Sequence, residues 1–81
     1  MTKEKVIAEI EDILKYDFDR PDVTITKTTA LSDLYISSLE LADLILKIEE
    51  TFDIETPFGN GSFPFGYIDE FIDWLVNKIN E

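Results

Sequence analysis

Apolar residues recur at helical spacing in three parts of the chain, and this pattern predicts three main helices. The first helix is expected over residues 2–16, with Thr2 as its N-cap, the second from about Ser38 to about Asp53, and the last over residues 67–80. Each helix carries one stripe suited to a common core. In chain order the stripes are Val6, Ile7, Ile10, Ile13 and Leu14; Leu41, Leu44, Ile45, Ile48 and Phe52; and Ile68, Phe71, Ile72, Leu75, Val76 and Ile79.

The helix over 38–53 carries a second apolar stripe on another side. Its members are Leu39, Ala42 and Leu46, and the acidic residues Glu40, Asp43, Glu49 and Glu50 flank it. Carboxylates beside an apolar stripe disfavour full burial, because a charged group loses its hydration there. The second stripe therefore either faces a partner or is further core of a small helical bundle.

Two connections separate the predicted helices. Residues 17–37 have no strong period, although alternation around Val23 and Ile25 predicts a short extended piece on the core, and Leu31 and Leu34 are expected to tuck under the helices. The second connection, Phe58–Gly66, contains all three glycines and three phenylalanines. We expect an ordered loop whose aromatic side chains plug the core. The chain thus reads as a single all-α domain over residues 1–81.

The net charge of −11, from 18 acidic and 7 basic residues, limits the classes of partner that the protein can bind. Such a field repels nucleic acid and anionic membranes and attracts basic proteins. No apolar run approaches the roughly 20 residues of a membrane span, and no secretory leader is recognisable after Met1. We therefore expect a cytoplasmic protein without stable membrane insertion.

The absence of cysteine and histidine removes the thiolate nucleophile, the commonest general base and the commonest metal ligands. The run that begins at Asp17 faintly resembles a calcium loop, but Asp22 stands where glycine is needed and Thr28 where glutamate is needed. No phosphate-binding glycine loop is present, and the many carboxylates fall on predicted solvated faces. We expect no metal site and no catalytic activity.

The hydroxyl of Ser38 is a candidate functional group of another kind. Ser38 follows Ser37 directly before the apolar-periodic stretch, so it would lie at the positive end of a helix. Most serines at such positions are simply caps. A hydroxyl held there is also well suited to carry a phosphate-linked group.

The neighbourhood of this serine strongly resembles the acyl carrier protein family. The motif is Asp33-Leu34-x-x-x-Ser38-Leu39, followed by acidic residues on the next helix and by the exit run Ile48–Pro57. The likeness covers most of residues 2–57. It implies that Ser38 carries covalent 4′-phosphopantetheine, taken from coenzyme A, whose thiol holds an acyl group as a thioester.

The resemblance also implies a fold and a set of partners. The family fold is a four-helix bundle of three major helices and a short one, in a protein that we expect to be monomeric. A phosphopantetheinyl transferase and acyl ligases, synthases or transferases with basic docking surfaces are the implied partners, in fatty-acid, polyketide or related biosynthesis. The partner-facing residues that follow from it are Ile36, Ser37, Leu39, Glu40, Ala42, Asp43, Leu46 and Glu49.

Three departures from the family pattern point to a specialised carrier. Ser37 replaces an aspartate before the modified serine, Tyr35 replaces a glycine, and the aromatic loop replaces or reduces the short third helix. Two alternatives stay open. In the first, the protein is a peptidyl or aminoacyl carrier. In the second, it is an unmodified acidic helical interaction module.

Overall fold

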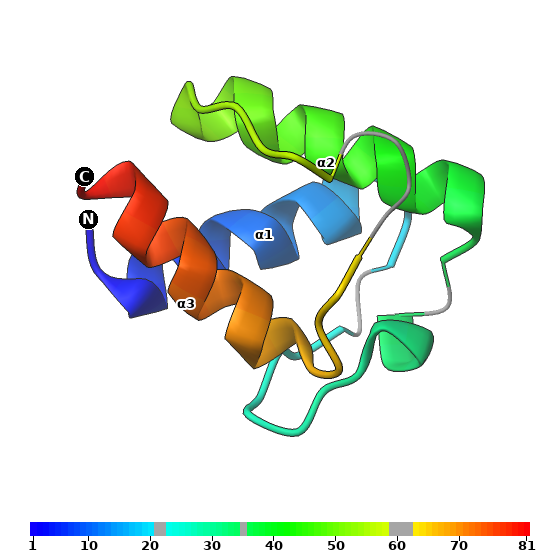
Figure 1. Cartoon of the computed structure of the whole chain (residues 1–81). Helices are drawn as coiled ribbons and strands as arrows, with labels where there is room; N and C mark the ends of the chain where they lie inside the picture. The colour runs from blue at the N-terminus through cyan, green and yellow to red at the C-terminus, as the bar shows by residue number, and fades with distance from the viewer. Residues whose placement is uncertain (21–22, 35, 59–62) are drawn as a thin grey trace.

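Three α-helices and a short 3₁₀ helix make up the regular structure of the computed structural model, which describes residues 1–20, 23–34, 36–58 and 63–81 (Figure 1). Within these ranges the elements are α1 (Lys3–Asp17), η1 (Leu31–Leu34), α2 (Ser38–Phe52) and α3 (Ile68–Ile79). The predicted all-α fold with three main helices is confirmed. The four-helix bundle is wrong for this chain, because the described elements include only three α-helices.

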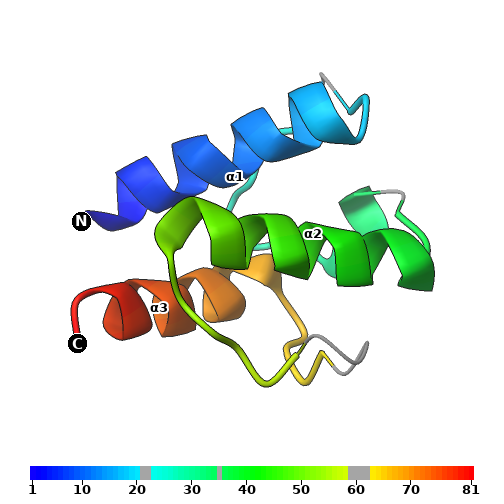
Figure 2. The same cartoon turned by 90° about the horizontal axis from the view of Figure 1, so that it is seen from above.

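The three α-helices lie side by side, with α1 packed against both α2 and α3 (Figures 1 and 2). Both α2 and α3 run in the direction opposite to α1, so the start of α2 lies at the far end of the molecule from the two termini. The termini are tied together: the Met1 ammonium donates to Asn80 Oδ1 at 2.8 Å, and Asn80 Nδ2 donates to the Met1 carbonyl at 3.0 Å.

The core is built mainly from the three predicted stripes, with Ile25, Leu34 and Phe58 added from the connections. Its buried side chains are Val6, Ile10, Ile13, Leu14, Ile25, Leu34, Leu41, Leu44, Ile45, Ile48, Phe58, Ile68, Phe71, Ile72 and Leu75. Four members of the predicted stripes lie at its margin and are only partly buried, namely Ile7, Phe52, Val76 and Ile79. Burial of apolar side chains is the main favourable term in folding. The apolar pattern of the sequence therefore identified most of the residues that stabilise the fold.

The start of α1 is fixed by a cap and by two ion pairs. Thr2 Oγ1 accepts a hydrogen bond from the Lys5 amide at 3.3 Å, which confirms the predicted N-cap. Lys3 Nζ lies 2.7 Å from Asp69 Oδ1 and 2.9 Å from Asp73 Oδ1, and thereby joins α1 to α3. Hydrogen bonds that the Lys3 ammonium donates to the carboxylates of Asp69 and Asp73 raise the pKa of Lys3 above its usual value.

The first connection contains a helical turn that the sequence pattern did not predict. Ile25 is buried and Val23 partly buried, as expected for an extended piece on the core. The chain then forms η1, which places Leu34 in the core. At its start the Ala30 amide donates to Asp33 Oδ2 at 2.9 Å. The short helical element thus comes before α2.

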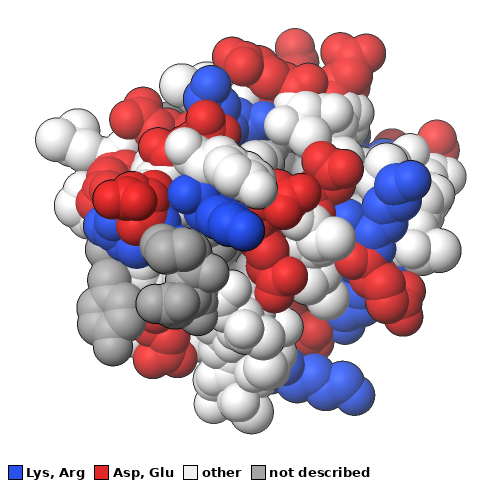
Figure 3. Space-filling model, turned by 180° about the vertical axis from the view of Figure 1, so that it is seen from behind, with Lys and Arg blue, Asp and Glu red and all other residues white. Residues whose placement is uncertain are grey.

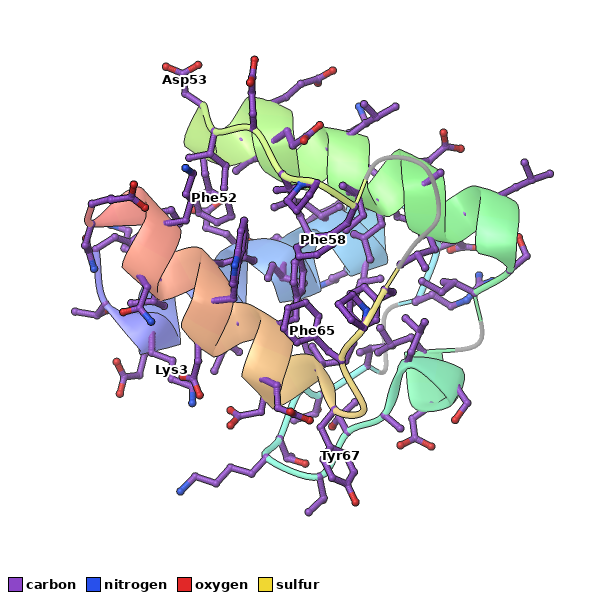
Figure 4. All side chains as sticks on the ribbon, viewed as in Figure 1. Lys3, Phe52, Asp53, Phe58, Phe65 and Tyr67 are labelled. Carbon is purple, nitrogen blue, oxygen red and sulfur yellow. The ribbon has the colours of Figure 1, made fainter. Side chains whose placement is uncertain are left out.

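The second connection brings aromatic side chains together between α2 and α3, where Figure 4 shows Phe58 and Phe65. We call Phe58, Phe63, Phe65, Phe71 and Trp74 the ring cluster. Phe58 and Phe71 are buried, whereas Phe63, Phe65 and Trp74 are partly buried. The predicted aromatic plug is therefore present, with Phe58 at its centre and the other loop rings at its rim. Residues 59–62 of the predicted loop lie outside the described residues.

Candidate functional site

The start of α2 is defined by a reciprocal pair of hydrogen bonds. Ser37 is the N-cap, and its Oγ accepts from the Glu40 amide at 3.2 Å. In return the Glu40 side chain accepts from the Ser37 amide through Oε1 at 3.0 Å. This capping box arises because a serine is followed three residues later by a glutamate. Of the two adjacent serines, Ser37 is the one that caps the helix.

Ser38 is the first residue of α2. Its side chain and all of Tyr35 lie outside the described residues. The first backbone hydrogen bond at this end runs from the Leu41 amide to the Ser37 carbonyl at 2.9 Å. The amides that precede it carry the positive end of the helix dipole, which favours a negatively charged group attached there. The capping role that sequence reasoning weighed for Ser38 belongs instead to Ser37.

An arginine from the first connection also reaches the start of α2. Arg20 Nη2 lies 3.5 Å from Glu40 Oε2, and Arg20 Nη1 donates to the Phe18 carbonyl at 2.7 Å. The C-terminal end of α1 is thereby linked to the capping box. Sequence reasoning missed Arg20, because an ion pair between residues so far apart in the chain leaves no periodic signal.

The segment that leads into α2 is anchored in the core. Leu34 of η1 is fully buried, and Ile36 packs partly buried against the core. Nearby, the Ile68 amide donates to the Thr29 carbonyl at 2.9 Å, and Ala30 forms a bridge with Tyr67. These contacts join the segment before η1 to the start of α3.

The outer face of α2 exposes the second apolar stripe. Leu39 is 81% exposed and Leu46 is 53% exposed, while Ala42 is partly buried. Asp43, which lies between them in the sequence, is exposed. The alternative in which the second stripe is further core is therefore wrong for its two leucines.

Glu49, another predicted partner-facing residue, is turned back toward its own chain. Its Oε2 accepts from the Thr56 amide at 2.7 Å and from the Thr56 hydroxyl at 3.0 Å. Glu40 is similarly engaged in the capping box and with Arg20. The role of these two carboxylates toward a partner stays a prediction, and the structure gives each an internal role as well.

A shallow hollow of about 280 Å³ lies beside the outer face of α2, between this helix and the end of α1. Its lining residues are Asp17, Phe18, Asp43, Leu46, Lys47 and Glu50. The back view of the surface shows acidic side chains gathered along the upper edge, where α2 lies (Figure 3). Apolar and acidic groups thus occur together next to the exposed stripe.

The residues present at the start of α2 fit a phosphate-linked group. Ser37 and Leu39, on either side of Ser38, are both exposed. The positive helix end and the nearby Arg20 guanidinium favour a negative charge. Because the Ser37 Oγ accepts the hydrogen bond from the Glu40 amide, modification of Ser37 would disrupt the start of the helix.

A family model described as a phosphopantetheine attachment site matches residues 4–60. The match covers well over half of the chain, including nearly all of α1 together with η1 and α2, so the protein belongs to the phosphopantetheine-attachment family. This confirms the resemblance to acyl carrier proteins. Searches of curated protein sequences and of solved structures found no match.

Family membership identifies the cofactor and the general role. Domains of this family are the sites of covalent 4′-phosphopantetheine attachment, and they act as carrier domains that are generally non-catalytic. They interact with a phosphopantetheinyl transferase and with partner enzymes. None of the helices in the described part of the chain combines the length and the apolar character required to cross a bilayer.

Proposed function

We propose that the protein carries an acyl intermediate as a thioester on 4′-phosphopantetheine attached to Ser38. The observation that carries this proposal is the match to the phosphopantetheine-attachment family, which spans the helix start with the Ser37–Ser38 pair. Modification replaces the proton of the serine hydroxyl by the phosphopantetheine phosphate of coenzyme A and releases the adenosine bisphosphate half. The thiol of the attached group then supplies the thioester chemistry that a chain without cysteine lacks.

The outer face of α2 is the docking surface in this proposal. Leu39 and Leu46 are exposed apolar residues that a partner can cover, and Asp43 adds charge beside them. A chain with a net charge of −11 attracts enzymes with basic surfaces and speeds their approach. A small apolar contact of this kind suits brief docking on a transferase, ligase or synthase of fatty-acid, polyketide or related specialised biosynthesis.

The modification test uses coenzyme A, a broad-specificity phosphopantetheinyl transferase and intact-mass measurement. We expect the wild-type protein to gain one phosphopantetheine and Ser38→Ala to gain none. The matched control is Ser37→Asp, which keeps a helix-capping residue next to the site and is expected to be modified. Circular dichroism is the check that both variants keep their helices.

Other outcomes of this measurement have definite meanings. A mass gain that persists in Ser38→Ala but is lost in Ser37→Ala assigns the cofactor to the other serine. No gain with several transferases supports the unmodified interaction module. A gain followed by selective loading of an amino acid by a partner ligase supports the peptidyl or aminoacyl carrier.

A further inference from the structure

The ring cluster joins the loop after α2 to α3, and Figure 4 shows two of its members, Phe58 and Phe65, between these helices. Phe58 is only 6% exposed. Its ring centroid lies 5.1 Å from that of Trp74 and 5.3 Å from that of Phe65. The centroids of Phe71 and Phe63 lie 5.9 Å and 6.5 Å from it. Phe58 therefore touches rings from both the loop and α3, in the edge-to-face geometry that aromatic pairs prefer.

The rim of the cluster is closed by further ring contacts. Phe63 lies 5.3 Å from Phe65 and 5.1 Å from Phe71, and Phe65 lies 5.5 Å from Phe71, all between ring centroids. Protein interiors are packed about as densely as organic crystals, so interlocked rings leave little space for a chain of methylene groups. A cargo entering here has to displace at least one ring.

Phe58 is also held in place through its backbone. Its amide donates to Thr56 Oγ1 at 3.3 Å, and Thr56 is bonded through both its amide and its hydroxyl to Glu49 of α2. The backbone of Phe58 is thus tied to α2 through Thr56, and its ring packs against Phe71 and Trp74 of α3. Glu49 contributes to this arrangement through the same carboxylate that sequence reasoning assigned to partners.

We infer that Phe58 is a specificity-determining residue that bars acyl chains from the interior, so that this carrier holds its cargo outside the helices. The inference rests on the proposed carrier function. A long aliphatic chain left in water is disfavoured in proportion to its exposed apolar surface. The cargo class that suits an outside position is therefore short-chain or polar acyl groups.

The main experiment compares the protein loaded with acetyl, hexanoyl and dodecanoyl pantetheine through a stable amide in place of the thioester. Methyl NMR of Ile45, Ile48 and Leu75 reports on the core, and thermal unfolding reports on stability. We expect the methyl shifts and the Tm to be the same across the series. Core shifts that grow with chain length, together with a rising Tm, overturn the inference.

Removal of the Phe58 ring is expected to let a long acyl chain enter the core. Phe58→Ala removes the central ring, and its dodecanoyl form is expected to show shifted core methyl signals and a higher Tm than its acetyl form. Phe52→Ala is the matched control, because it removes a partly buried phenyl ring that is not in the ring cluster. An equal chain-length response in Phe52→Ala overturns the role of Phe58. If Phe58→Ala does not fold, Phe58→Leu takes its place with the same expectation.

A second measurement does not depend on covalent loading. Free dodecanoyl pantetheine is added to the unmodified wild type and to Phe58→Ala, and the same methyl signals are followed. We expect movement only in the variant, and movement in the wild type contradicts the inference. Failure of the carrier function is instead seen as the absence of a mass gain with transferase, so the two failures are distinguishable.

Discussion

The two faces of α2 are both apolar, yet they differ in what lies opposite them. On the inner face, Leu41, Leu44, Ile45 and Ile48 are buried in the core. On the outer face, Leu39 and Leu46 remain largely in contact with water. Burial of the first set stabilises the fold, whereas the second set contributes little to folding because it loses little exposed surface. One helix therefore separates residues that build the domain from residues that are available for recognition.

A substitution on the inner face should destabilise the protein more than any other considered below. Ile48→Ala removes a side chain that is fully buried, and we expect a loss of about 2–5 kcal/mol in the free energy of unfolding because a cavity remains. Urea unfolding followed by circular dichroism measures this loss. A loss below about 0.5 kcal/mol, the range of ordinary surface substitutions, would falsify the burial assigned to this face.

The next effect concerns the capping box, which sets where both faces of α2 begin. Ser37→Ala removes the acceptor for the Glu40 amide, and the expected loss is about 1 kcal/mol in the free energy of unfolding. Ser37→Asp is the control, since aspartate caps equally well. An equally destabilised Ser37→Asp contradicts the capping explanation. Urea midpoints of the two variants, measured side by side, decide between them.

At the C-terminal end of α2, the conformation and charge of the capping residue are unfavourable. A substitution there should stabilise the protein. Asp53 has a left-handed backbone, with φ of 55°, and its carboxylate lies near the negative end of the helix dipole. Asp53→Gly is expected to raise the free energy of unfolding by up to about 1 kcal/mol, because glycine adopts this conformation without strain. Asp53→Ala removes the charge but keeps the strain, so a comparable gain there attributes the effect to charge alone. Thermal unfolding measures both.

The smallest effect on stability is expected on the outer face. Leu39→Ser combined with Leu46→Ser should change the free energy of unfolding by no more than about 0.5 kcal/mol per site, as at other exposed positions. The rate of modification by the transferase is expected to fall, because a docking surface is lost. Transferase kinetics at unchanged helical circular dichroism check this. Unaltered kinetics remove the docking role from this face.

A charge substitution tests the outer face separately from its apolar residues. Asp43→Lys reverses a carboxylate at an exposed position, and we expect slower transferase kinetics with unchanged helicity, because a basic partner is repelled. Glu40 is a poor choice for this test, since its side chain is part of the capping box and pairs with Arg20. The salt dependence of the rate is the further readout, because added salt screens the attraction in the wild type and should shrink the difference between the two proteins.

The sequence predicted the elements whose signal is periodic. Ile10, Ile45 and Ile72 each lie on a predicted stripe and are buried in the structure. The Thr2 cap could also be predicted, because a polar residue directly before such a stripe is a local signal. The turn at η1 was missed, because four residues are too few to show a helical period.

Contacts between distant parts of the chain could not be predicted from local patterns. Glu49 looks like a surface carboxylate beside an exposed stripe, and only the folded path of the chain brings Thr56 to it. Likewise, Arg20 and Glu40 meet because α1 and α2 lie side by side. The choice between the adjacent serines depends on the capping box, and there Ser37 and Glu40 do carry a local signal, a serine followed three residues later by glutamate.

The chain has one tryptophan, and Trp74 packs against Phe58 with ring centroids 5.1 Å apart. Indole emission responds to the polarity of its surroundings, so the ultraviolet fluorescence of the unlabelled protein reports on the ring cluster alone. Opening of the ring cluster is expected to shift this emission to longer wavelength as water approaches the indole. The protein thus contains its own optical probe for the opening of the ring cluster.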